Sequence, residues 1–401
     1  MLVPMRFTSG FFAFSLLASA ACFGSRTPLA QRGDGGVVTV CGTDGPTCVT
    51  TGDDPCGLPK LVTPDCDEST KKFHCPSGTV ERAPNPTGVC RPYHDGTIAA
   101  IGGSMTRIPT DDGRCYWIAE DAVVKGTKKR NLAIDATDDV LYGACPQKPA
   151  IVGEIVDLAV PDPANYVVQL LGGVKLGTDI RVLYRLFRLD ASGPLGLVEL
   201  GGGFARWTAS GRLAVPGPGE VLWGPELSLG DAFLVKDDRL YVWGCPPPVA
   251  NLTEKCIVAR FEVGSDEFTV YQSDGSWSHF FTPSQAGYQF DAGPWLGSVV
   301  PRSGGFLHTT IVGYGSDVQA QTASKPEGPW TAAPKVRACD LPSGDKQSFC
   351  AGPIVHEEMM NPKNPNTLVI VHGVGTTASD ASYRLATFPD DYWPRLVWVT
   401  P

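Results

Sequence analysis

The chain has 401 residues, with 33 Lys and Arg against 42 Asp and Glu, and its formal net charge is -9 at pH 7. This balance excludes the basic face with which nucleic-acid-binding proteins displace counterions from phosphates. Hydrophobic residues make up 42% of the chain, which excludes a disordered chain and a protein with many membrane spans. Thirteen cysteines, beside 46 Gly and 35 Pro, are typical of an oxidising compartment.

Residues 1–22 have the pattern of an export signal. Arg6 is the only charged residue, the apolar run FTSGFFAFSLL follows at 7–17, and small residues precede Cys22. The run is too short for a bilayer core of about 30 Å. Cleavage either produces a secreted protein or makes Cys22 the lipidated first residue of a bacterial lipoprotein. We favour lipidation, because it leaves an even number of cysteines; residues 23–40 are then a flexible tether.

Residues 41–92 form a predicted cysteine-rich segment. Turn-forming residues dominate it and apolar periodicity is almost absent, so it cannot bury a core without covalent staples. Its six cysteines predict three disulfides, with 15 alternative connectivities: Cys41, Cys48, Cys56, Cys66, Cys75 and Cys90. Zinc is the alternative ligand, but the segment has no CxxC pair, and we expect no metal site and no cofactor.

From residue 93 onwards, short apolar runs alternate with polar residues and are separated by Gly and Pro. This period-two pattern predicts half-buried strands and an all-β domain over 93–401. The runs are CYWIA (115–119), IRVLYRLFRL (180–189), DAFLV (231–235), RLYVWG (239–244), IVARFEV (257–263), FLHTTIV (306–312) and TLVIVH (367–372).

The runs repeat as strand, glycine, strand, turn and tryptophan. Tyr241, Phe306 and Leu368 hold the same place in three copies, at spacings of 65 and 62 residues. A repeat of this length gives about five units over 93–401 and predicts a five-bladed β-propeller. A β-sandwich or a jelly roll is the structural alternative.

The later cysteines predict further disulfides. Cys245 with Cys256, and Cys339 with Cys350, each enclose a short loop. Cys115 and Cys145 join two strands of the first blade or tie that blade to the cysteine-rich segment.

Several stretches resemble a bacterial family catalogued as domain of unknown function 4185. They are DDGRCYWIAED (111–121), DAFLVKDDRLYVWG (231–244), PEGPW (326–330) and IVHEEMMNPKNPNTLVIVHG (354–373). The resemblance implies a five-bladed propeller and, as in some members assigned to glycoside hydrolase family 183, cleavage of D-arabinan. It also implies that Asp121 is the base or nucleophile. The chain departs from the family pattern at Ser104, where an acidic residue is frequent, and at Ala122, where Thr is frequent.

Glycoside hydrolysis requires two carboxyl groups on opposite sides of the scissile bond. Besides Asp121, we predict two further catalytic acids. Asp231 lies at the start of a strand, and Glu357 is the expected general acid. Neighbours on a strand point to opposite faces, so only one of Glu357 and Glu358 is expected to reach the funnel. The structural alternative is that these acids are turn residues or solvated side chains.

Substrate contacts are predicted from His356 and from three tryptophans outside the repeated position, which suit sugar stacking: Trp117, Trp223 and Trp295. Trp277, Trp330 and Trp393 recur at one blade position and are expected to pack between blades.

These observations predict an exported glycosidase acting on an arabinan-like polysaccharide. The expected partner is a glycan, and the protein is expected to be a monomer that contacts the membrane only through a lipid anchor. We expect it at the outer membrane or the cell surface; otherwise it is secreted. The alternative is a non-catalytic carbohydrate- or protein-binding lipoprotein on the same scaffold, which the missing acid at Ser104 favours. A structural envelope protein is third.

Overall fold

The structure is a computed structural model. It describes residues 45–50, 56–67, 69–70, 72–191, 196–207, 211–246, 254–262, 264–292, 297–311, 315–380, 384 and 387–400. These residues belong to one compact unit, Cys41–Pro401. Within the ranges given, no helix has the length and apolar character needed to cross a membrane.

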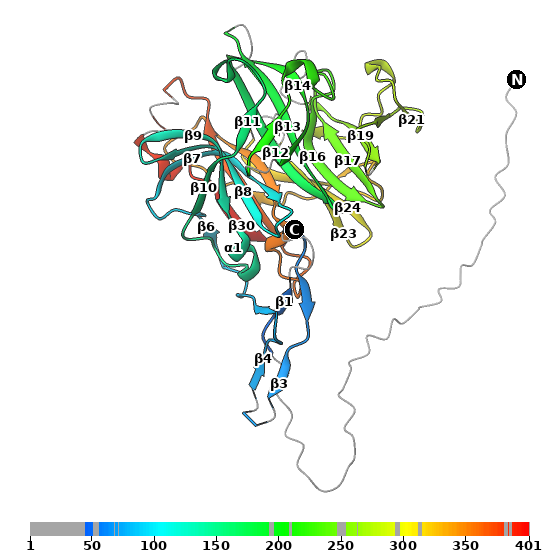
Figure 1. Ribbon diagram of the computed structural model, residues 1–401. Coiled ribbons are helices and arrows are strands. Elements are labelled where there is room, and N and C mark those ends of the chain that lie inside the picture. Colours follow the sequence, from blue (N-terminus) through cyan, green and yellow to red (C-terminus); the bar gives the residue numbers. More distant parts are fainter. Residues whose placement is uncertain are drawn as a thin grey trace, which may run out of the picture. The chain divides into compact units, whose positions relative to one another are not determined.

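Five sheets of four or five strands make up most of the described chain (Figure 1). The first has the order β10-β9-β8-β7 and contains β7 (Ile98–Pro109), β8 (Cys115–Val124), β9 (Thr127–Asp135) and β10 (Ala150–Glu154). The second has the order β11-β15-β14-β13-β12 and contains β11 (Val156–Leu158), β12 (Tyr166–Leu176), β13 (Asp179–Leu189), β14 (Leu197–Trp207) and β15 (Leu213–Val215). The third has the order β16-β17-β19-β20-β21 and contains β16 (Leu229–Lys236), β17 (Arg239–Gly244), β19 (Ile257–Glu262), β20 (Phe268–Tyr271) and β21 (Trp277–Ser278).

The last two sheets continue the pattern. The fourth contains β23 (Ser298–Arg302), β24 (Gly305–Thr310), β25 (Asp317–Ala323), β26 (Thr331–Ala332) and β27 (Arg337–Ala338). The fifth has the order β28-β29-β30-β6 and contains β28 (Ser348–Val355), β29 (Leu368–Thr376), β30 (Arg395–Val399) and β6 (Val89–Cys90). A short helix, α1 (Thr137–Tyr142), lies between β9 and β10 of the first sheet.

One inner strand from each of the five sheets packs against the others in a ring, and these inner strands are β7, β12, β16, β23 and β28. β7 contacts β12 and β28, β16 contacts β12 and β23, and β23 contacts β28. A ring of antiparallel sheets around a common axis is the architecture of a β-propeller. The all-β prediction is therefore confirmed, and the sandwich and jelly-roll alternatives are wrong.

Bulges in the inner strands bring the ring close together. β7, β12, β16 and β28 each shift register against the second strand of their sheet, and glycines lie at the shifts. Gly172 has φ 135° and Gly230 has φ 122°, a conformation that is strained for other residues. A Cβ at Gly230 would lie 2.0 Å from Leu171 Cδ1, so glycine permits the close approach of β16 to β12.

The cysteine-rich segment is tied to the sheets by strand pairing and disulfides. Its strand β6 completes the fifth sheet beside β30, and the two lie side by side in Figure 1. It also contains β1 (Cys48–Thr50), β2 (Lys60–Val62), β3 (Asp65–Asp67), β4 (Lys72–His74) and β5 (Val80–Glu81). Whether residues 41–92 are a separate domain stays a prediction.

The disulfides confirm part of the predicted pairing and correct the rest. Cys245–Cys256 and Cys339–Cys350 are bonded as predicted. The expectation of three disulfides within 41–92 is wrong, because Cys48–Cys75 lies within it whereas Cys56–Cys115 and Cys90–Cys145 leave it. Cys115 and Cys145 therefore follow the second alternative and tie the first sheet to the segment. Cys66 is also disulfide-bonded, while Cys22 and Cys41 lie outside the described residues.

Candidate functional site

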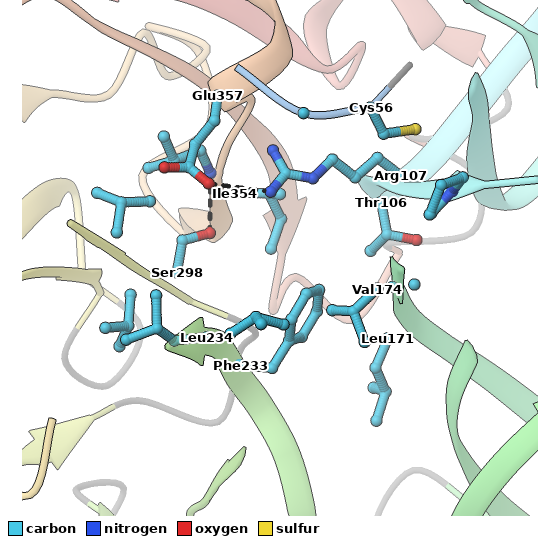
Figure 2. Close-up of a pocket in the computed structure, with 18 of the residues that line it drawn as sticks. Cys56, Thr106, Arg107, Leu171, Val174, Phe233, Leu234, Ser298, Ile354 and Glu357 are labelled. Carbon is cyan, nitrogen blue, oxygen red and sulfur yellow. Dashed lines mark hydrogen bonds and ion pairs between the residues drawn. The ribbon is translucent and has the colours of Figure 1, made fainter. Parts of the chain in front are cut away.

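A cavity of about 330 Å³ lies where the inner strands meet (Figure 2). All five inner strands contribute to its wall, together with residues 56–58 of the cysteine-rich segment. Its volume falls at the lower end of the range of roughly 300–1,000 Å³ that is usual for ligand pockets. The lining includes Leu58, Thr106, Arg107, Leu171, Val235, Ser298, Pro301, Ile354 and Glu357.

The mouth of the cavity faces the carboxyl ends of the inner strands. Leu58 is 48% exposed and Val235 is 41% exposed, and Pro301 is exposed as well. Leu171 and Ile354, which also line the cavity, are buried. The cavity therefore has an apolar, solvent-exposed rim and a buried inner end.

An ion pair crosses the wall of the cavity. Arg107, near the end of β7, places Nη2 3.2 Å from Oε2 of Glu357, which follows β28 in the short 3-10 helix η5 (Glu357–Met359). Both side chains are 17% exposed. Burial acts to lower the pKa of Arg107, but the carboxylates of Glu358 and Glu357 outweigh it and raise that pKa above its ordinary value. Arg107 is thus a fixed cation in the wall.

Glu358 holds Arg107 from the protein interior. Its carboxylate is fully buried and accepts hydrogen bonds from Arg107 Nη1 at 2.6 Å and Trp117 Nε1 at 3.2 Å. Oε1 also lies 2.6 Å from His356 Nδ1. Burial raises the pKa of Glu358, but Arg107 and His356 lower it more, to about 2. Glu358 is therefore ionised and orients Arg107 toward the cavity.

Two of the predicted substrate contacts lie in the core instead. His356 is completely buried, and its Nε2 donates to the carbonyl oxygen of Met105 at 3.1 Å. Trp117 is also completely buried, with its ring centroid 4.4 Å from that of His356. Both side chains pack around Glu358, so the prediction that they touch substrate is corrected: they support the residues that line the cavity.

The other predicted tryptophans do not form a sugar platform among the described residues. Trp223 is 2% exposed and packs edge-on against Phe204 and Phe261 between strands of the second and third sheets. Its prediction as a substrate contact is therefore wrong. Trp295 lies outside the described residues.

The three predicted catalytic acids do not meet in the cavity. Only Glu357 lines it. Asp121 is 46% exposed on β8, where Lys128 Nζ lies 3.0 Å from its Oδ2. It belongs to an exposed ion pair rather than to the cavity wall.

Asp231 has a structural environment. Its Oδ1 lies 2.7 Å from Nη2 of Arg185 on β13, and its Oδ2 accepts the backbone N–H of Cys245 at 2.6 Å. Burial raises the pKa of Asp231, although Arg185 opposes the shift. The carboxylate therefore joins the second and third sheets, and the expected convergence of Asp121, Asp231 and Glu357 is corrected.

Sequence reasoning missed three residues of the site. Arg107 could have been identified from the sequence, because a positively charged residue among the apolar residues at the end of a strand needs a buried partner of opposite charge. Thr106 lines the cavity, is 3% exposed, and its hydroxyl has no hydrogen-bond partner among the described residues. Ser298, which accepts the N–H of Val355 at 2.9 Å, carries no comparable signal in the sequence.

A second carboxyl of interest lies on β8, away from the cavity wall. Glu120 accepts a hydrogen bond from Gln169 Nε2 of β12 at 3.3 Å. Burial, and then the neighbouring charge of Asp121, raise the pKa of Glu120 to about 7. A carboxyl with this pKa is half-protonated near neutral pH and can act as an acid.

One cluster of metal-ligand types occurs among the described residues. Atoms of Cys339, Cys350 and His372 lie within 4.8 Å of one another. The two sulfurs are joined in a disulfide, so they do not offer the thiolates that a soft metal requires.

Comparison with known proteins identifies likenesses of fold. No family model and no curated protein matches the sequence. A candidate hydrolase from Bacteroides ovatus ATCC 8483 is similar in structure over 75% of this chain and 86% of its own, with 14% identity and a TM-score of 0.54.

Weaker structural similarity extends to glycoside hydrolases. A thermostable family-43 glycoside hydrolase has 11% identity and a TM-score of 0.45, over 78% of this chain and 92% of its own. A family-43 enzyme from Xanthomonas citri complexed with xylose has 10% identity and a TM-score of 0.46, over 78% and 90%. At 14% identity, the likeness to the Bacteroides ovatus protein establishes the fold alone.

Proposed function

We propose that the protein binds a carbohydrate in the cavity at the centre of its propeller. One observation carries the proposal: the cavity combines the Arg107–Glu357 ion pair with the buried hydroxyl of Thr106, which has no hydrogen-bond partner in the part of the chain that the structure describes. Sugar hydroxyls both donate and accept hydrogen bonds, so they can satisfy a guanidinium, a carboxylate and a hydroxyl together. The apolar walls suit the C–H faces of a sugar ring, as is usual in ligand pockets.

Binding without cleavage is the function that this geometry supports best. Glycoside hydrolysis needs two carboxyl groups about 5–9.5 Å apart across the scissile bond. Among the described residues that line the cavity, Glu357 is the only carboxylate, and it is paired with Arg107. The alternative of a non-catalytic carbohydrate-binding propeller is therefore preferred.

Titration calorimetry tests the proposal. Arabinose, xylose, galactose and their trisaccharides are titrated into the wild-type protein, into Glu357→Gln, and into Asp121→Asn as a control with an acid outside the cavity. We expect one of the sugars to bind the wild type and Asp121→Asn equally, and Glu357→Gln to bind it at least about tenfold more weakly, as for a lost charge-assisted hydrogen bond. Absence of binding by every sugar would contradict the proposal.

Hydrolysis of an arabinan-like polysaccharide is the second candidate. It is favoured by Glu120, because a carboxyl group with a pKa of about 7 suits a general acid. The neighbouring carboxylate of Asp121 is paired with Lys128. Incubation with D-arabinan and with xylan, followed by chromatography, tests it. Released oligosaccharides that disappear in both Glu120→Gln and Asp121→Asn would support this candidate over simple binding. Release that persists in both variants, or no release by the wild type, would eliminate the role of these acids.

We further propose that the protein is exported and anchored by a lipid on Cys22. The disulfides in the described residues support an oxidising compartment. Mass spectrometry of the mature N-terminus tests this: a lipidated Cys22 is expected, whereas an unmodified chain beginning at Ala21 indicates plain secretion.

A further inference from the structure

The cysteine-rich segment contributes directly to the cavity. Cys56, Gly57 and Leu58 lie in its wall, beside residues from all five inner strands. Figure 2 shows Cys56 next to Arg107 at one side of the cavity. The segment is therefore more than a spacer between an N-terminal anchor and the propeller.

Two links hold the segment against the sheets, one at Cys56 and one at Arg82. The Cys56–Cys115 disulfide attaches it to the first residue of β8. Arg82, which is 4% exposed, donates from Nη1 and Nη2 to the backbone carbonyl oxygen of Glu358, each at 3.2 Å. Because the side chain of Glu358 holds Arg107, the same residue connects the segment to the ion pair in the cavity.

Leu58 lies in the solvent-exposed part of the cavity wall. Leu58, Val235 and Pro301 form the exposed rim, whereas Leu171 and Ile354 bury the inner end. Because part of the lining consists of buried side chains, we expect the cavity to accommodate the end of a chain rather than a chain that continues on both sides. Its volume of about 330 Å³ is small for a ligand pocket.

We propose that residues 56–58 form one side of the mouth, and that Leu58 restricts the site to the terminal sugar of a glycan rather than an internal one. The inference rests on the proposed carbohydrate binding and specifies its ligand. The chemical class is a mono- or disaccharide unit at a chain end, with the remainder of the chain passing Leu58 into solvent.

Leu61 supplies a matched control. It lies on β2 in the same segment, is 52% exposed, and is absent from the cavity wall among the described residues. Both leucines are changed to Ala and to Trp, and a monosaccharide and the corresponding trisaccharide are titrated into each variant. Since both side chains are exposed, these changes leave the core intact.

We expect Leu58→Trp to weaken trisaccharide binding about tenfold while changing monosaccharide binding much less, and Leu58→Ala to shift the preference toward the trisaccharide. Both Leu61 variants are expected to bind as the wild type does. If Leu58 and Leu61 variants bind alike, the inference is overturned, while binding by the wild type still upholds the proposed function.

Hydrogen–deuterium exchange of the unliganded protein tests the wall even if no sugar binds. Releasing the segment in Cys56→Ser/Cys115→Ser is expected to speed exchange at the amides of Thr106 and Arg107. Cys245→Ser/Cys256→Ser, which removes a disulfide from the third sheet, is the control and is expected to leave these amides unchanged. Equal exchange in both variants would show that the segment does not cover the cavity.

Discussion

At the scale of single residues, the buried carboxylate of Glu358 determines the geometry of the candidate site. It is the point at which Arg107, Trp117 and His356 meet, and its backbone also accepts hydrogen bonds from Arg82. A buried charge of this kind is tolerated because both of its oxygens are hydrogen-bonded. Its neighbour Glu357 points to the cavity, so two adjacent glutamates have different roles.

Replacing Glu358 is expected to destabilise the protein strongly. Glu358→Gln leaves Arg107 without its buried counter-charge, which costs on the order of 3 kcal/mol. Glu357→Gln is the matched control and is expected to cost less, because Glu357 is partly exposed. Urea unfolding measures both free energies; equal losses would mean that Glu358 is not the anchor.

The pKa of Glu358 also predicts a pH dependence. Its folded-state pKa of about 2 lies below the ordinary value near 4.5, so its ionisation stabilises the folded state above that ordinary value. This stabilisation is lost as pH falls from about 4.5 toward 2. Urea midpoints between pH 2 and 5 are therefore expected to fall more steeply for the wild type than for Glu358→Gln; parallel curves would contradict this assignment.

At the scale of elements, the bulged inner strands set how closely the sheets meet around the cavity. Gly230 on β16 approaches Leu171 on β12, and Gly172 on β12 approaches Phe233 on β16. Leu171, Gly172 and Phe233 all line the cavity. The glycines thus shape the site without offering a side chain to a ligand.

Gly230→Ala is expected to lower the free energy of unfolding by at least about 1–3 kcal/mol, because the backbone conformation is strained for alanine and the new Cβ meets Leu171. Gly219→Ala, where a Cβ has no neighbour within 4 Å, is the control and is expected to change stability by less than about 0.5 kcal/mol. Thermal unfolding of the two variants compares them, and similar losses would refute the argument.

At the scale of the whole described chain, the ring of sheets is closed by pairing between its two ends. β6 completes the last sheet, and Cys90–Cys145 ties that strand to the chain that follows α1. The disulfide spans 55 residues, against 11 for Cys245–Cys256. In the chain-entropy model a longer loop gives more stabilisation, here about 4 kcal/mol.

Removing the closing disulfide is therefore expected to lower the Tm more than removing a local one. Cys90→Ser/Cys145→Ser and Cys245→Ser/Cys256→Ser are compared by calorimetry at one scan rate. An equal or smaller decrease for the first variant would show that closure does not depend on Cys90–Cys145.

The repeat spacing allowed the propeller architecture to be predicted, because period-two runs and recurring turns are local features. The local disulfides were predictable for the same reason. Cys56–Cys115 was not, since spacing along the chain does not reveal which distant strands meet. Likewise, neither the family resemblance around Asp121 nor the fact that residue 117 is a tryptophan shows on which face of its strand each side chain lies. The approach of Arg107 to Glu357 depends on the meeting of the first and last sheets.

The most direct test of the account is a crystal structure with the tightest-binding sugar from the calorimetric series. We predict a single sugar unit in the central cavity, within hydrogen-bond distance of Arg107, Glu357 and Thr106, with any further units leaving past Leu58. A sugar bound instead beside Glu120 and Asp121, with the cavity unchanged, would contradict the assignment of the cavity as the carbohydrate site.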